Sequence, residues 1–192
     1  MGADIVALPQ PIRSGGLSLA ETLDSRHSVR EYDSSRPVRL QDLSNILWAA
    51  VGVNRPQDDK LTSPTAMNKQ EISAYVISVE GAFLYDARKN ELHKVADGDH
   101  RSLVAGTAEF TQDYVLDAPV SILLVADTAK LPSPEACMID AGIACENINL
   151  AAQALGLATV PRLTMDKDAL HKVLGLSPAC MVVLNNPVGY AK

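Results

Sequence analysis

The chain has 192 residues, of which 47% are hydrophobic and 21% are charged, and its formal net charge is −6. This length and composition are typical of one globular domain that can enclose a hydrophobic core. The negative charge argues against sequence-independent nucleic-acid binding, which needs a clustered basic surface to displace counterions.

Targeting and membrane signals are weak in this sequence. No apolar run approaches the ~20 residues needed to span a bilayer. The first residues lack the basic region and apolar stretch of a signal peptide. We therefore expect no membrane partner and, for the chain as given, a soluble cytoplasmic protein. A periplasmic or secreted protein stays open if a leader is removed from a longer precursor.

The N-terminal third predicts an arm, two helices and a loop. Residues 1–17 are rich in proline and glycine, which indicates an extended arm before a single domain over 18–192. Ser18 and Glu21 have the spacing of a capping box, so we expect a helix from Leu19 to Arg26. A second helix should follow Pro37 and end at Gly52. Its apolar face is formed by Leu40, Leu43, Ile46, Leu47, Ala50 and Val51. Residues 52–68 are predicted to be a loop.

The middle of the chain favours antiparallel strands. Residues 72–79 are rich in β-branched and aromatic side chains, and Glu80-Gly81 then turns the chain into a meander over 83–85 and 92–95. Asp99 is a candidate helix cap. Residues 119–126 are almost entirely apolar, which is typical of a central strand covered on both faces.

The C-terminal third predicts the longest helix, over 134–155, with Gly156 as its C-terminal turn. Its expected buried face consists of Ile139, Ile143, Ile148, Ala151, Ala152 and Leu155. A strand over 157–161, a helix capped by Asp166 and a last strand over 180–184 follow. Strands and helices alternate irregularly, so the predicted class is α+β rather than a doubly wound sheet.

The chemistry-bearing residues are few. Arg26-His-Ser-Val-Arg30 places two guanidinium groups four residues apart, where a bound phosphate could lie between them, and a solvated basic patch is the alternative. The histidines are scattered, and no nucleophile elbow, P-loop or dinucleotide fingerprint is present. Cys137, Cys145 and Cys180 have no zinc-binding spacing, so we expect buried free thiols and no metal site. If the protein is an enzyme, a bound cofactor should carry the chemistry, with no catalytic side chain.

Several segments together resemble the nitroreductase family. They are Ser25-Arg-His-Ser-Val-Arg-Glu-Tyr32, residues 47–55, residues 62–70, residues 140–152, residues 155–161 and Val188-Gly-Tyr190, which cover the chain from about residue 18 to 192. The subgroup most similar is the short, single-domain branch related to oxidases and dehydrogenases of azoline rings. The resemblance implies a central, mostly antiparallel sheet flanked by helices, in an intertwined homodimer that binds FMN.

The resemblance also implies a set of FMN-binding residues. Arg26 and Arg30 would hold the phosphate, or one of them would approach the pyrimidine edge of the flavin, and His27 and Ser28 would complete the contact, with Lys192 as a further basic group. The partner subunit would lay Ser63, Pro64, Thr65, Ala66 and Asn68 against the flavin ring. Backbone N–H groups of the segment Pro161, Arg162, Leu163 and Thr164 would approach flavin N5 and O4.

Three features depart from the family pattern. Glu146 replaces the usual glutamine of the long helix, the chain stops at Lys192 without further basic residues, and only Thr111 and Gln112 are candidates for a polar contact to the pyrimidine ring. The implied activity is ping-pong hydride transfer from NADH or NADPH to a nitroaromatic, quinone or similar small acceptor. Two alternatives remain open, an azoline-type oxidase or dehydrogenase that uses O2, and a non-catalytic FMN-binding or storage protein.

Overall fold

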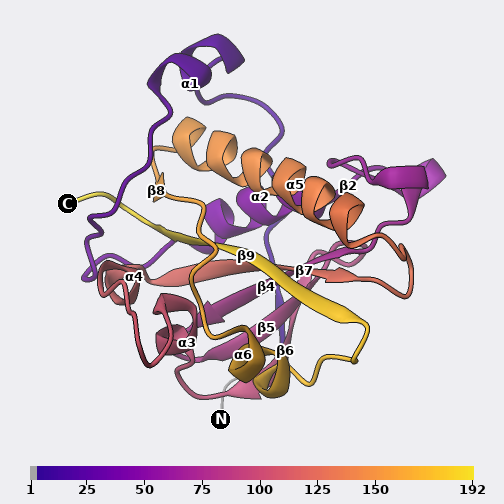
Figure 1. Cartoon of the computed structure of the whole chain (residues 1–192). Helices are drawn as coiled ribbons and strands as arrows, with labels where there is room; N and C mark the ends of the chain where they lie inside the picture. Colours follow the sequence, from indigo (N-terminus) through magenta and orange to yellow (C-terminus); the bar gives the residue numbers. More distant parts are fainter. Residues whose placement is uncertain (1–3) are drawn as a thin grey trace.

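A seven-stranded sheet forms the centre of the computed structural model, which describes residues 4–192 (Figure 1). Its strands are β1 (Ile5–Ala7), β4 (Ile72–Ser78), β5 (Gly81–Asp86), β6 (Glu91–Asp97), β7 (Val120–Asp127), β8 (Ala158–Thr159) and β9 (Cys180–Gly189). Their order is β1-β6-β5-β4-β7-β9-β8, and every neighbouring pair is antiparallel. The expected α+β class and the antiparallel sheet are confirmed.

Helices cover both faces of this sheet. They are α1 (Leu19–Ser25), α2 (Leu40–Val51), α3 (Arg101–Ala105), α4 (Tyr114–Asp117), α5 (Pro134–Ala154) and α6 (Lys167–Val173). Alternate side chains of β4 enter different cores, because successive residues of a strand point to opposite faces. Ala74 and Val76 pack in the core beneath α2 and α5, while Tyr75 and Ile77 pack in the core on the side of α3 and α6. Figure 1 shows these two helical layers above and below the sheet.

The predicted helix ends are well reproduced. Ser18 accepts a hydrogen bond from the backbone N–H of Glu21, whose carboxylate accepts from the N–H of Ser18, so the capping box is present. Asp166 caps α6 through the N–H of Ala169 at 2.9 Å. Gly156 and Gly175 follow α5 and α6 with φ values of +71° and +61°, a region that favours glycine. The expected cap at Asp99 is displaced by one residue, because His100 is the N-cap of α3, and the Asp99 carboxylate accepts from the N–H of Arg101.

Two predictions about the loop after α2 and the packing of α5 are wrong. The loop expected over 52–68 contains a short hairpin, β2 (Val53–Arg55) and β3 (Lys60–Leu61), and the 3-10 helices η1 (Pro56–Asp58) and η2 (Ala66–Asn68). The second error concerns α5, whose Ile139 is 65% exposed. The buried face of α5 is built mainly from small residues, since these permit close packing against the sheet and α2. They are Cys137, Ala141, Ala144, Cys145, Ile148 and Ala152.

The N-terminal arm is extended as expected, apart from residues 1–3, which lie outside the described part. Residues 5–7 form β1, which adds an edge strand to the sheet by pairing with β6, and Leu8 is buried in the core. Among residues 4–192, no helix is long and apolar enough to cross a bilayer.

The cysteines are free, as expected. Cys137 and Cys145 are buried, and Cys180 is half-buried rather than buried. Burial raises the pKa of the Cys145 thiol to about 11, so this side chain stays a protonated core residue at neutral pH.

Candidate functional site

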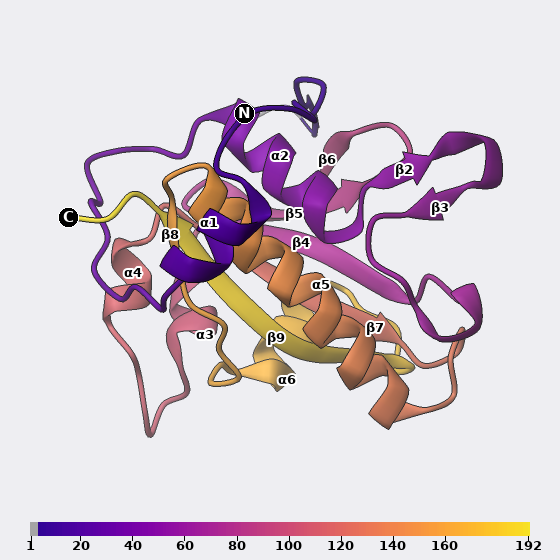
Figure 2. The same ribbon diagram turned by 90° about the horizontal axis from the view of Figure 1, so that it is seen from above.

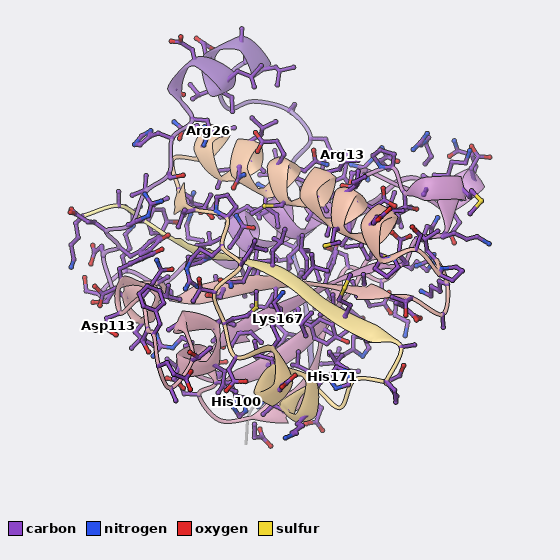
Figure 3. All side chains as sticks on the ribbon, in the orientation of Figure 1. Arg13, Arg26, His100, Asp113, Lys167 and His171 are labelled. Atoms are coloured by element: carbon purple, nitrogen blue, oxygen red, sulfur yellow. The ribbon has the colours of Figure 1, made fainter. Side chains whose placement is uncertain are left out.

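The basic segment Arg26–Arg30 leaves α1 as extended chain. Arg26 has φ −61° and ψ 125°, and its N–H donates to Thr22 O as the last bond of the helix. The idea that both arginines share a helical face is therefore wrong, because the helix ends at Ser25. Figure 3 shows Arg26 where α1 meets α5.

Backbone contacts and the hydroxyl of Tyr32 fix this extended segment against the end of the sheet. The N–H of Val29 donates to Thr159 O of β8 at 3.1 Å. Tyr32, which is fully buried, bridges to Ala191, and its hydroxyl donates to Val29 O at 3.0 Å and to Pro187 O at 3.3 Å. The contacts with β8 and β9 thus fix the position in space of the backbone that carries Arg26 and Arg30.

The positively charged side chains of this segment make few contacts with the rest of the protein. Nε of Arg26 lies 4.0 Å from Oε1 of Glu146, and these side chains are 35% and 51% exposed. Within residues 4–192, the exposed side chains of Arg30 and Ser28 form no hydrogen bond or ion pair. His27 is exposed, with Nδ1 2.9 Å from Ser25 O. Guanidinium and hydroxyl groups that lack internal partners can donate to a phosphate.

Lys192 joins the segment through its backbone, with its N–H 3.4 Å from Glu31 O. Its ammonium group lies 3.4 Å from Asp117 Oδ2, and the side chain is 57% exposed. Its charge is therefore paired at the surface by a weak ion pair.

The segment Pro161–Thr164 follows β8 and is anchored by Arg162. The backbone N–H and carbonyl of Arg162 both pair with Asn185. Its buried guanidinium donates to Val104 O, Ala105 O, Asn185 Oδ1 and Gln112 Oε1. The side chain of Arg162 is thus committed to the protein interior, and burial lowers its pKa.

Two N–H groups of this segment stay free for a ligand. The N–H groups of Leu163 and Thr164 donate to no acceptor among residues 4–192, whereas the N–H of Arg162 is occupied by Asn185. Leu163 is 68% exposed, so this part of the backbone is at the surface. Of the candidates for a pyrimidine contact, Gln112 accepts from Arg162 and Thr111 donates to Thr107 O.

The segment Ser63–Asn68 packs on a different side of α5. The buried Ser63 hydroxyl donates to Ala50 O and accepts from Asn147 Nδ2 at 3.0 Å. Thr65 Oγ accepts from the N–H of Gln70, and the N–H of Ala66 donates to Asp140 Oδ2, both at 2.8 Å. Pro64 and Asn68 are exposed.

Within one chain, Ser63–Asn68 and Arg26–Arg30 do not meet. Arg26 approaches Glu146 and Ser63 approaches Asn147, which are consecutive residues about 100° apart around the helix. No hydrogen bond or ion pair between described residues joins the two segments. Figure 2 shows α1 over the C-terminal end of α5, and the β2–β3 hairpin beyond the end of α2.

Most of the predicted site residues are exposed, whereas Ser63 and Arg162 are buried. A cavity of about 440 Å³ lies beneath the start of α2, where Val38, Phe83 and Arg101 contribute to its wall, and it contains none of the predicted residues. Figure 3 places His100 and His171 far from Arg26, on the opposite side of the sheet. Among residues 4–192, no cluster of His, Cys, Asp and Glu could hold a metal ion.

Comparison with known proteins identifies the class. Residues 23–190 match the nitroreductase family, so the chain belongs to this family. A protein of Methanocaldococcus jannaschii that is assigned as a nitroreductase is 28% identical over 185 residues, which is 90% of this chain and 91% of that protein.

Solved structures agree in fold. A protein of Ralstonia eutropha assigned as a nitroreductase superposes with a TM-score of 0.89 at 30% identity, over 99% of this chain and 90% of its own. An FMN-dependent nitroreductase of Clostridium difficile superposes with a TM-score of 0.65 at 20% identity, over 89% and 86% of the two chains. The second likeness shows the shared fold alone.

Proposed function

We propose that this chain is an FMN-dependent oxidoreductase that transfers hydride from NADH or NADPH to a nitroaromatic, quinone or similar small acceptor, and that it works as a homodimer. The observation that carries the proposal is the joint position of two groups. The partner-free Arg30 and Ser28 are fixed to β8 by Val29, and the free N–H groups of Leu163 and Thr164 follow the same strand.

The donors present fit FMN. Arg30, Ser28 and Arg26 supply planar cationic and hydroxyl donors suited to its phosphate, and Lys192 adds a nearby positive charge. The N–H groups of Leu163 and Thr164 can donate to acceptor atoms at the edge of a flavin ring. When bound, FMN supplies the ring system that accepts and releases hydride.

In this proposal the protein's own residues bind FMN, orient it and polarise its ring system. Arg162 contributes through its position, because its buried guanidinium fixes the backbone that precedes Leu163. Fixed N–H donors and cations stabilise negative charge without reorganising during the reaction. No side chain in the site is assigned a proton-transfer step.

A second subunit would complete the site. Most of the predicted residues are exposed in one chain, and Pro64 and Asn68 are exposed on a segment that forms no hydrogen bond or ion pair with Arg26–Arg30 of the same chain. Met138 and Ile139 of α5, which are 50% and 65% exposed, form an apolar surface beside that segment. We propose that the partner covers this surface and lays its own Ser63–Asn68 segment against the flavin.

Anaerobic reduction of the FMN-loaded protein tests the proposal. NADH or NADPH should bleach the flavin absorbance, and a nitroaromatic or quinone should restore it. If neither nucleotide reduces the bound flavin, the assignment as an NAD(P)H oxidoreductase is wrong. Reduction by an azoline substrate, with reoxidation by O2, would instead support the azoline oxidase alternative.

A further inference from the structure

Glu71, immediately before β4, has a buried carboxyl group that lacks a donor. Its side chain is 0% exposed. Neither Oε1 nor Oε2 accepts a hydrogen bond from any residue in 4–192. An ionised carboxylate in such a place is strongly unfavourable, because burial removes its hydration and nothing replaces it.

The charged surroundings of Glu71 are dominated by a second carboxyl group. Asp140 of α5, which is 5% exposed, faces Glu71, and Cys137 lies on the same helix. Lys130, in the turn after β7, donates to Gln70 O at 3.3 Å and is a more distant positive charge. Asp127 donates its backbone N–H to Glu71 O, and its carboxylate accepts from Ala129. Lys69, on the turn that packs against α5, is exposed.

We propose that Glu71 and Asp140 share one proton, which Glu71 carries and donates to Asp140, and that this bond positions the turn Thr65–Gln70 on α5. Asp140 is the acceptor because its Oδ2 already accepts from the N–H of Ala66 at 2.8 Å. A protonated Glu71 donates one hydrogen bond to Asp140 and removes one of the two buried negative charges. Loss of the proton would leave two buried negative charges facing each other. The same repulsion keeps one proton bound in other pairs of neighbouring carboxyl groups.

The turn Thr65–Gln70 depends on hydrogen bonds that hold its backbone in place. Met67, Asn68 and Gln70 have φ values of 52°, 55° and 50°, which non-glycine residues adopt at some cost. The bonds Ala66 N–H to Asp140 and Gln70 N–H to Thr65 Oγ oppose that cost. Since the turn includes three of the residues that we place against the partner's FMN, its position bears on cofactor binding, and this consequence rests on the proposed function.

The direction of the pH dependence follows from burial. Burial is the largest cause that raises the pKa of Glu71 above its ordinary value of 4.5, and Asp140 raises it further, while the backbone of Glu71 and the charge of Lys130 partly oppose this rise. The folded protein thus keeps a proton that the unfolded chain releases above that value. Stability from this proton is present at low pH and is lost as pH rises through the folded pKa. Between the two pKa values the unfolding equilibrium constant rises up to about tenfold per pH unit.

Glu71→Gln is the decisive variant, because its amide can still donate to Asp140 but does not titrate. The amide protection factor of Ala66, corrected for the intrinsic exchange rate, should fall with rising pH in the wild type and stay level in Glu71→Gln. Glu80→Gln is the matched control, since Glu80 is exposed in the β4–β5 turn, and it should behave as the wild type. Equal pH dependence in the wild type and Glu71→Gln would overturn the proposal.

Infrared difference spectroscopy of the unmutated protein gives a second readout. The difference is taken between unlabelled protein and protein labelled with ¹³C-glutamate. Near neutral pH the wild type should show the carbonyl stretching band of a protonated carboxylic acid, and the label should shift the frequency of this band. Absence of this band would overturn proton sharing even if the variant fails to fold.

The FMN dissociation constant, measured across the same pH range, separates the two proposals. It should rise with pH in the wild type and not in Glu71→Gln. A constant value together with the infrared band would retain the shared proton and contradict the placement of the turn at the flavin.

Discussion

Arg162 was expected near the cofactor, but its guanidinium is buried and contributes by fixing the backbone of the site. Four hydrogen bonds tie its guanidinium to Val104, Ala105, Gln112 and Asn185. The sequence indicated that the Pro161–Thr164 segment matters, but the direction of the side chain depends on α3 and β9. Those contacts are distant in sequence, so no local pattern could predict them. The paired carboxyl groups of Glu71 and Asp140 were missed for the same reason.

Arg162→Met should destabilise the fold by at least ~3 kcal/mol, because it leaves several buried acceptors without a donor. Urea unfolding measures the loss, and exposed Lys172→Met serves as the matched control with a change near zero. A stability equal to that of the wild type would show that the buried network contributes nothing.

His27 is exposed and its ring is bonded only to the backbone of Ser25. Since hydride transfer needs placement rather than acid–base chemistry, His27→Gln should keep flavin reduction by NADH or NADPH within about tenfold, a change of roughly 1.4 kcal/mol or less. Single-turnover kinetics at full FMN occupancy measure it. A loss of about 10²–10⁴ that follows one titration would identify His27 as a proton-transfer residue.

Among the elements, those with a local signal were predictable. The capping box of α1, the Asp166 cap of α6 and the apolar run of β7 depend on neighbouring residues, and all were confirmed. The β2–β3 hairpin was missed because its strands are short and polar. The buried face of α5 was predicted in part, since Ile148 and Ala152 are buried as expected. Ile139 is exposed, and the buried small residues Ala141 and Ala144 were missed. Ile139 is exposed in a single chain, and the proposed partner subunit would cover it in the dimer.

Ser18→Ala removes the side-chain cap of α1, whose C-terminal end leads into Arg26. The expected cost is about 1 kcal/mol, local to this short, exposed helix. Hydrogen exchange of the α1 amides should accelerate, while the amides of β7 stay unchanged. Ser35→Ala, in the turn after Tyr32, is the control. Equal acceleration across β7 would mean that α1 unfolds only with the whole domain.

At the scale of the whole molecule, the sheet and its two helical layers explain how the candidate site is built and why it is open in one chain. The sheet end fixes Arg26–Arg30 beside Pro161–Thr164, while Ser63–Asn68 contacts a different side of α5 (Figure 2). The family resemblance predicted which segments matter, and the partner subunit stays a prediction.

The proposed homodimer can be tested through α5. An obligate dimer buries on the order of 2,000 Å² or more, and a charge placed in such a surface opposes association. Ile139→Asp should therefore shift the mass measured by light scattering at micromolar concentration toward the monomer. Val79→Asp, at an exposed valine of the β4–β5 turn, should leave the mass unchanged. A wild-type monomer that carries FMN would contradict the dimer.

The extended segment after α1 is proposed to hold the phosphate of FMN, and equilibrium titration of the apoprotein with FMN measures its contribution to binding. Loss of one charge-assisted contact costs roughly 1.5–3 kcal/mol, so Arg30→Ala and Arg26→Ala should each weaken binding about 10- to 150-fold. Lys89→Ala, an exposed cation between β5 and β6, should bind FMN as the wild type does. Unchanged FMN affinity in both arginine variants would contradict the account.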